Sequence, residues 1–145
     1  LEPQALAAAA DHIGDEALDR LAKNLKHAVK IYPSVGPAEL FKLEEALHMD
    51  CVDQCPNQEI VEALRRTRCL HLASRYVLGN EVELPEQEPF FVEHANIVEA
   101  MRQHQYGTVL KEAQAHLEES MPKVVKRVNC AREALAPPNL PFVVD

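Results

Sequence analysis

Apolar residues recur every three or four positions in successive segments of this chain, and this helical spacing limits the folds open to it. One segment carries Leu18, Leu21 and Leu25, and a later one carries Phe91 and Ile97. Proline and glycine separate the segments, as at residues 33–37. We therefore predict an all-α fold, an antiparallel bundle of about six helices. The helices are expected near residues 1–12, 15–32, 38–54, 58–78, 90–104 and 109–120, with Pro122 kinking or interrupting the last.

The composition agrees with a single helical domain. A chain of 145 residues is long enough for its own core, and only 4 of its residues are glycine. Its net charge of −8 gives it no general attraction for nucleic acid, so any contact with DNA would need another domain. No stretch has the length of a membrane span or the pattern of a signal peptide.

The four cysteines are Cys51, Cys55, Cys69 and Cys130. The first two form a CxxxC pair, which is neither the redox CxxC motif nor a zinc-ribbon pair. A helical chain of this size does not need a disulfide framework. We expect all four to be reduced, and the protein to be cytoplasmic.

Three histidines occupy positions where the helical pattern calls for apolar side chains. His48, His94 and His116 each fall in the apolar stripe of a different predicted helix, and Glu44 lies one turn before His48. Positions 94 and 116 are 22 residues apart, as expected for two sites that face each other across a helical hairpin. Because a bare imidazole or carboxylate in a core is costly, one shared metal ion explains the set together. Three imidazoles and a carboxylate suit Zn²⁺ first, and also Ni²⁺, Co²⁺, Fe²⁺ or Mn²⁺.

A simpler interpretation competes with the metal. Any one of these histidines, taken alone, is more often a hydrogen-bonded core residue than a ligand. The four residues together favour the metal. His71 points to the same interior and would line the cavity or support a bound ligand.

The motifs around these residues resemble a known family. Residues 40–57, LFKLEEALHMDCVDQCPN, resemble the segment D-x-x-F-H-x-x-L-x-x-x-x-x-N of the FCD domain, the C-terminal effector-binding domain of FadR-type regulators in the GntR family. Residues 93–100, EHANIVEA, resemble the family's E-H-x-x-I-x-x-A. Residues 113–117, AQAHL, resemble its later A-x-x-x-H-L, shortened here to A-x-x-H-L. Residues 1–10 look like the end of the first FCD helix, and the likeness extends to about residue 127.

The resemblance implies a set of ligands for the metal. Metal-binding members of the family use an Asp and three His, which correspond by position to Glu44, His48, His94 and His116. Glu44 departs from the usual Asp, since it keeps the charge but adds a methylene group.

The resemblance also implies an effector. A small organic acid would bind at the metal, and the family's Asn position corresponds to Asn57. An Arg that the family carries just before the position of Leu1 is missing, so we assign its task to Thr67, Arg68 and His71.

The resemblance further implies a non-catalytic role, as the sensor half of a bacterial transcriptional regulator that acts as a homodimer. Residues 1–135 would form the sensing domain and residues 136–145 a Pro-rich tail. The N-terminal winged helix-turn-helix of such regulators is not expected in this chain, so DNA would be bound only through that missing domain. Two alternatives remain open: a mononuclear metalloenzyme on a helical bundle, and a metal-free helical interaction module.

Overall fold

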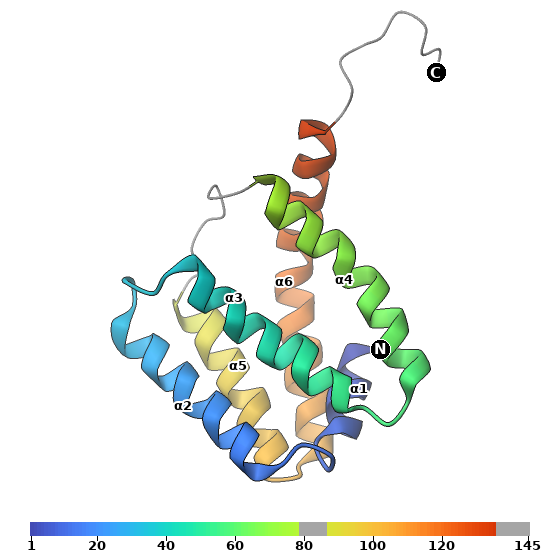
Figure 1. Cartoon of the computed structure of the whole chain (residues 1–145). Coiled ribbons are helices and arrows are strands. Elements are labelled where there is room, and N and C mark those ends of the chain that lie inside the picture. The colour runs from blue at the N-terminus through green and yellow to red at the C-terminus, as the bar shows by residue number, and fades with distance from the viewer. Residues whose placement is uncertain (79–86, 136–145) are drawn as a thin grey trace, which may run out of the picture.

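Six α-helices and two short irregular helical segments form the described part of the chain, which contains no strand (Figure 1). This computed structural model describes residues 1–78 and 87–135, with the backbone alone at residues 37, 70–72, 74–78 and 87–89. The all-α prediction is confirmed. The elements are α1 (Glu2–Ala9), α2 (Asp15–Ile31), α3 (Pro37–Glu45), the π-helix η1 (Ala46–Cys51), the 3-10 helix η2 (Val52–Gln54), α4 (Gln58–Leu78), α5 (Gln87–Arg102) and α6 (Tyr106–Ala134).

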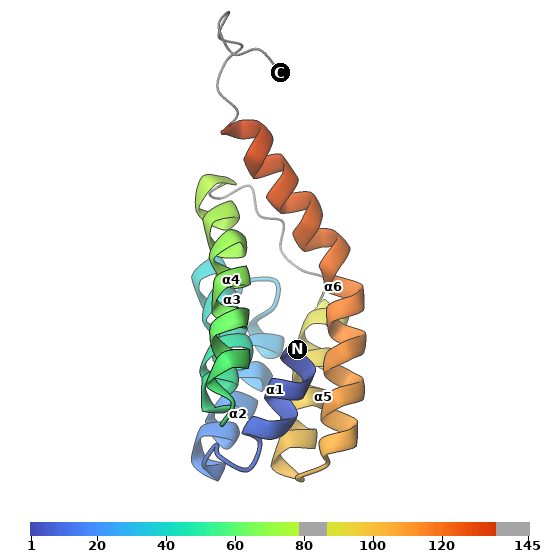
Figure 2. The ribbon, with the colours of Figure 1, turned by 90° about the vertical axis from the view of Figure 1, so that its right-hand side faces the viewer.

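The hairpin of α5 and α6 is the centre of the packing. α2 packs on α5, while the short α1 and the longer α4 both pack on α6 (Figures 1 and 2). The chain passes from α3 directly through η1 and η2, which contact α1. As a result, η1, α1, α5 and α6 meet in one region although they are far apart in the sequence.

The core is built from the apolar stripes that the sequence shows. α2 buries Leu18, Leu21 and Leu25, and α5 buries Phe91 and Ile97. Each such side chain contributes about 1.5–3 kcal/mol when it leaves water. None of the described helices combines the length and the apolar character that a membrane crossing needs.

A polar contact joins the two turns at one end of the bundle. Asp11, after α1, accepts hydrogen bonds from the Tyr106 hydroxyl at 2.7 Å and from Nδ1 of His104 at 3.0 Å. His104 has a φ of 52°, a left-handed conformation that few residues other than glycine adopt. The contact therefore fastens the α5–α6 turn to the turn after α1.

Several predicted boundaries were wrong. α1 ends at Ala9 rather than near residue 12. Gly14 occupies the N-cap position of α2, and Asp15 begins the helix, where its negative charge interacts favourably with the positive end of the helix dipole. α5 begins at Gln87 rather than near residue 90, because a proline in the first turn, here Pro89, removes no helical hydrogen bond.

Pro122 kinks the last helix without interrupting it. α6 is continuous through Pro122, and Figure 2 shows its axis changing direction in the upper half. Residues 79–86, which are most of the connection expected between the helices ending near 78 and beginning near 90, and the tail predicted at residues 136–145 lie outside the described residues.

Candidate metal centre

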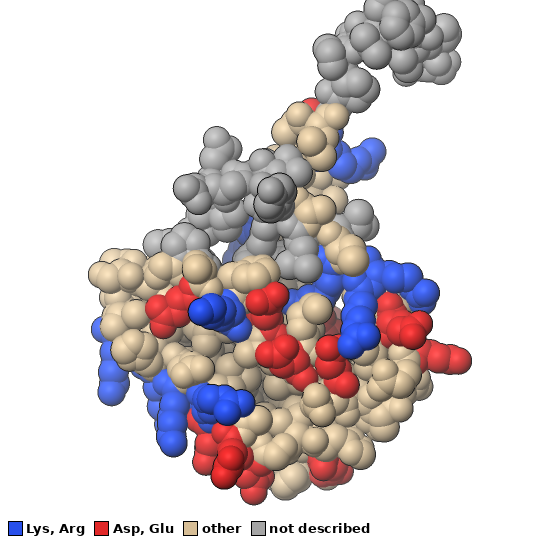
Figure 3. Space-filling model, in the orientation of Figure 1, with Lys and Arg blue, Asp and Glu red and all other residues tan. Residues whose placement is uncertain are grey.

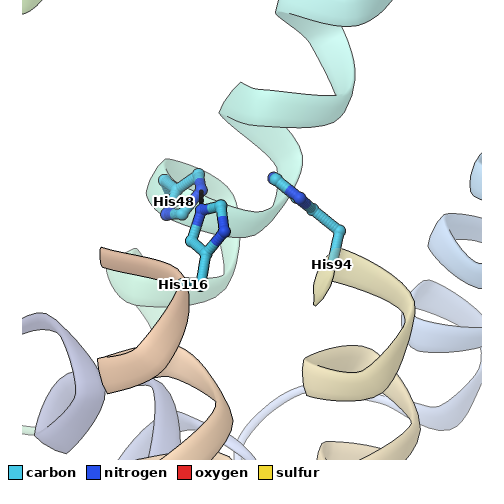
Figure 4. Close-up of side chains that lie close together, drawn as sticks. All are labelled: His48, His94 and His116. Carbon is cyan, nitrogen blue, oxygen red and sulfur yellow. Dashed lines mark hydrogen bonds between the residues drawn. The ribbon is translucent and has the colours of Figure 1, made fainter. Parts of the chain in front are cut away.

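The three histidines predicted from the helical stripes meet inside the bundle. His48 comes from η1, His94 from α5 and His116 from α6, and their exposed fractions are 7%, 0% and 6%. Figure 4 shows the three rings directed toward a common space. The ring centroids are 5.2 Å apart for His48 and His94, 5.1 Å for His48 and His116, and 4.7 Å for His94 and His116.

Each imidazole is held by an oxygen on its outer side. Nδ1 of His94 donates to the carbonyl oxygen of Phe90 at 2.6 Å, and Nδ1 of His116 donates to Oε2 of Glu93 at 2.7 Å. Nδ1 of His48 donates to the carboxylate of Glu2. Because Nδ1 carries the proton in each neutral ring, each Nε2 is left as an acceptor. A carboxylate or carbonyl behind each histidine is the usual support of a metal-binding imidazole.

The inner nitrogens lack the partners that a closed core would provide. Nε2 of His94 is buried and has no hydrogen-bond partner. Nε2 of His48 and Nε2 of His116 face each other at 3.2 Å, although both are acceptors in the neutral rings. Only a proton or another cation between them makes that contact favourable.

The electrostatics of the histidines agree with this geometry. Burial, together with the neighbouring His48, lowers the pKa of His94 to about 3, so this ring stays neutral. Burial also opposes protonation of His48, but the Glu2 carboxylate outweighs it and the pKa of His48 is raised. In the metal-free protein a proton on Nε2 of His48 would satisfy the His48–His116 contact, in the place where a metal ion would bind.

The spacing of the nitrogens fits a metal ion. Two nitrogen ligands of a tetrahedral Zn²⁺, each about 2.0–2.1 Å from the ion, lie roughly 3.3 Å apart. The Nε2 atoms of His48 and His116 are 3.2 Å apart, and one ring nitrogen from each of the three histidines lies within 4.8 Å of the others. The donor set suits Zn²⁺ and the neighbouring divalent ions.

Two carboxylates border this centre, and Cys51 follows His48 on the same segment. Oε2 of Glu44, the predicted fourth ligand, lies 3.8 Å from Nε2 of His48, one turn earlier on the same chain segment. Glu2 lies on the outer side of His48, and its own pKa is lowered because the attraction of His48 exceeds the effect of burial. Burial and the nearby Asp50 raise the pKa of Cys51 to about 12, so this thiol stays protonated near neutral pH in the metal-free protein.

The π-helix gives His48 its position. A π-helix inserts an extra residue into a helical turn and occurs often at functional sites. In η1 it turns Leu47, His48 and Cys51 into the core. The same segment brings His48 against Glu2 of α1, a contact that an uninterrupted α-helical pattern does not predict.

The residues predicted to bind an effector lie at different depths. Arg68 is half-buried on α4, and its charge acts on both Glu2 and His48. Thr67 is exposed and its hydroxyl donates to the carbonyl of Leu64 at 2.8 Å. Asn57 is exposed and caps α4, since its Oδ1 accepts from the backbone N–H of Glu59 at 3.1 Å and of Ile60 at 3.3 Å. The side chain of His71 lies outside the described residues. Among the three predicted effector residues whose side chains the structure describes, only Arg68 acts on the charges of the centre.

Two residues that support the histidines were not predicted. Glu2 lies on the same face of α1 as the buried Leu6 and Ala9, so the stripe argument applied to α1 would have found it. Glu93 directly precedes His94, and its half-buried carboxylate reaches back to His116 across the hairpin.

Fold and centre together define an all-α domain with a buried three-histidine site suited to a metal. The family model of the FCD domain matches residues 1–119, and the chain belongs to this family, the effector-binding domain of GntR-family regulators. FCD domains are regulatory rather than catalytic. None of the curated proteins and none of the solved structures matched the chain.

Proposed function

We propose that this chain is the effector-sensing domain of a bacterial transcriptional regulator, with a divalent metal and a small organic acid as its ligands. His48, His94 and His116 would hold the metal, and Glu44 would complete the set from the turn before His48. One observation supports the proposal most directly. All three Nδ1 atoms are hydrogen-bonded to oxygens, whereas Nε2 of His94 has no hydrogen-bond partner and the Nε2 atoms of His48 and His116 face each other. Zn²⁺ is the first candidate, and Ni²⁺, Co²⁺, Fe²⁺ and Mn²⁺ are the alternatives.

The charges around the centre favour an acidic effector. When bound, a divalent metal supplies an electron-accepting position for a carboxylate oxygen. Arg68 supplies a second positive charge near Glu2 and His48, and can pair with a carboxylate in a bidentate manner. Three further residues remain proposed contacts for the effector: Asn57 at the cap of α4, and Thr67 and His71 on α4 itself.

The packing of the centre suits a switch rather than a reaction. His48, His94 and His116 connect η1, α5 and α6, and Glu2 adds α1 through His48. An effector that binds one packing of these helices better than another shifts the population toward it. In a homodimer this shift would change the relative placement of two DNA-binding domains located elsewhere in the regulator.

Metal analysis tests the histidine set. We expect the His94→Ala and His116→Ala variants to lose the bound metal, measured by elemental mass spectrometry after dialysis. His104→Ala is the matched control, because His104 is 52% exposed and lies at the far turn. Unchanged metal content in both core variants would refute the site.

A titration with small carboxylates tests the effector. We expect carboxylates to raise the melting temperature only when the metal is bound, and Arg68→Gln to weaken their binding by about 10–100-fold, as for loss of a charged hydrogen bond. Arg65→Gln is the control on the same helix, where Arg65 pairs with Asp53 at 2.9 Å on the surface. Equal binding with and without metal would contradict the proposed role of the centre.

A further inference from the structure

The outer face of α2 carries a row of cations with no acidic residue among them. Residues 20–38 include four basic residues and neither Asp nor Glu. The net charge of −8 for the whole chain is therefore the balance of +4 in this segment and −12 in the remainder. We call these four residues the basic row: Arg20, Lys23, Lys26 and Lys30.

The basic row lies opposite the side of α2 that packs in the core. At about 100° per residue, its four positions fall within roughly 120° of the helix circumference and extend over about 15 Å of its length. All four cations are exposed, and Figure 3 shows Lys and Arg side chains gathered over α2, toward the lower left of the molecule. The buried residues of α2 are centred on the other side of the helix and are Leu18, Leu21, Leu25 and Ala28.

The described side chains form no ion pair with the basic row. Other exposed cations, such as Arg65 on α4, do form ion pairs. Two carboxylates near the row are already engaged. Asp19 pairs with Arg102 at 2.6 Å, and Glu99, on which the charge of Lys26 acts, accepts a hydrogen bond from Arg102 at 2.8 Å. The positive charges of the row are therefore left for a partner outside this domain.

The helix dipole accounts for only part of this charge pattern. Asp15 and Glu16 in the first turn of α2 and Lys30 in its last turn are placed as the dipole favours. Lys23 and Lys26 lie in the middle of the helix, where the effect of the dipole has faded. Like charges three and four residues apart on one helix face also destabilise a helix. A row of this kind lowers the stability of α2 unless an anion binds to it.

We propose that the basic row binds the phosphate backbone of DNA. Each strand of the duplex carries one phosphate for about 3.4 Å of its axis, so a row about 15 Å long spans roughly four phosphates. Contacts from Lys and Arg to phosphates position a protein on the duplex without reading its sequence. The inference rests on the proposed function only in that a transcriptional regulator is held at DNA, and it gives this domain a contact of its own.

The acidic remainder of the chain does not prevent this contact. Charges on a protein surface are screened over about 10 Å at 0.1 M salt. A phosphate beside the basic row is therefore attracted mainly by the four cations, whereas the more distant carboxylates repel it weakly. The net charge of the chain predicts no general attraction for nucleic acid, but the local charge of this one face does.

The composition of the row favours DNA over an acidic protein as the partner. The centres of protein–protein interfaces are enriched in aromatic residues and depleted in lysine, and three of the four row residues are lysine. α2 contains no Phe, Tyr or Trp, and Val29 is its one exposed large apolar side chain. Val29 lies about 60° around the helix from Lys26, outside the row. The row thus lacks the apolar anchor on which a protein partner would depend.

Fluorescence anisotropy of a labelled random-sequence duplex of about 20 base pairs tests the row on the full chain. We expect a slope of log K against log [salt] of about −3.6 if all four cations contact phosphates. Lys23→Gln/Lys30→Gln should make this slope shallower by about 2 and weaken binding by about 10-fold or more, with unchanged circular dichroism. Lys123→Gln/Lys126→Gln is the matched control, because it removes the same charge from two exposed lysines of α6 and should bind like the wild-type chain.

The position of the charge, rather than its total, decides the outcome. Restored binding in Lys23→Arg/Lys30→Arg would support the row, since the cations are kept. A wild-type chain that does not bind the duplex at low salt, or an equal loss of binding in both glutamine variants, would overturn the proposal. A polyglutamate peptide that binds as tightly as the duplex would overturn it in favour of an acidic protein partner.

Metal content, measured on the same samples, separates this proposal from the metal centre. The basic row lies on the face of α2 opposite the core, so duplex binding should be the same in chelator and in zinc. A chain that binds the duplex but no metal refutes the centre alone. A chain that binds metal but no duplex refutes the row alone.

Discussion

Replacement of His94 by phenylalanine should stabilise the metal-free protein and weaken the metal-loaded one. The His94 side chain is completely buried and its Nε2 has no hydrogen-bond partner. Its ring lies 4.3 Å from that of Phe90, centroid to centroid, so one face of its surroundings is aromatic. His94→Phe keeps a planar ring of similar size at this position and removes the unsatisfied atom.

The magnitude follows from the two polar atoms of the ring. An unsatisfied buried group costs about 1–3 kcal/mol, whereas the hydrogen bond from Nδ1 to the Phe90 carbonyl contributes about 0.5–1.5 kcal/mol. The net gain of the metal-free variant is therefore about 1 kcal/mol, or roughly 3 °C in melting temperature for a chain of this size. With free metal at about 1,000 times its Kd, the wild-type protein gains about 4 kcal/mol that the variant lacks.

Differential scanning calorimetry with chelator and with added Zn²⁺ measures both effects. We expect the variant to melt above the wild-type protein in chelator and below it in zinc. His104→Phe is the control: because position 104 is exposed, this variant should show neither the higher melting temperature in chelator nor the lower one in zinc. If the chelated variant melts below the chelated wild-type protein, the unpartnered nitrogen is not a liability. If zinc raises both melting temperatures equally, His94 is not a ligand.

Three further predictions concern residues around the centre. Glu2→Gln should weaken metal binding by about 10–100-fold in a competition titration, because His48 loses the charged support of its Nδ1; an unchanged Kd would limit Glu2 to packing. Asn57→Ala should lower the free energy of unfolding by about 1 kcal/mol in urea, through loss of the α4 cap; no change would mean that water replaces the cap. In chelator, the free energy of unfolding should be greatest near pH 6.5. The lowered pKa of His94 contributes stability that is fully present above pH 6.5 and is lost as the pH falls toward 3. The raised pKa of His48 contributes stability that is fully present below pH 6.5 and is lost as the pH rises through the pKa of His48 in the folded protein. A steady rise of the urea midpoint from acid to alkaline pH would contradict this.

The helical spacing in the sequence was sufficient to predict the bundle and the three histidines. His48, His94 and His116 were found because each breaks an apolar stripe, and burial in the structure confirms that each stripe faces the core. The prediction that positions 94 and 116 face each other also holds, since hairpin geometry depends only on helix rise and turn length.

The surroundings of the histidines could not be predicted in the same way. Glu2 and His48 are 46 residues apart, and no periodic pattern relates α1 to η1. Nor does a sequence pattern show that Nε2 of His94 lacks a partner, because that depends on how α5 packs against η1 and α6. Side-chain spacing identifies the faces of helices, whereas packing decides which faces meet.

The π-helix makes the centre depend on the number of residues in η1 as well as on their identity. Ala46 contributes no ligand, yet deleting it would move His48 by one position, about 100° around the helix, relative to α3. The His48 imidazole would then lose its contacts with both Glu2 and His116. Insertions and deletions between α3 and His48 should therefore be far less tolerated than substitutions at the exposed Asp50 of the same segment, which makes chain length in this one turn a determinant of binding.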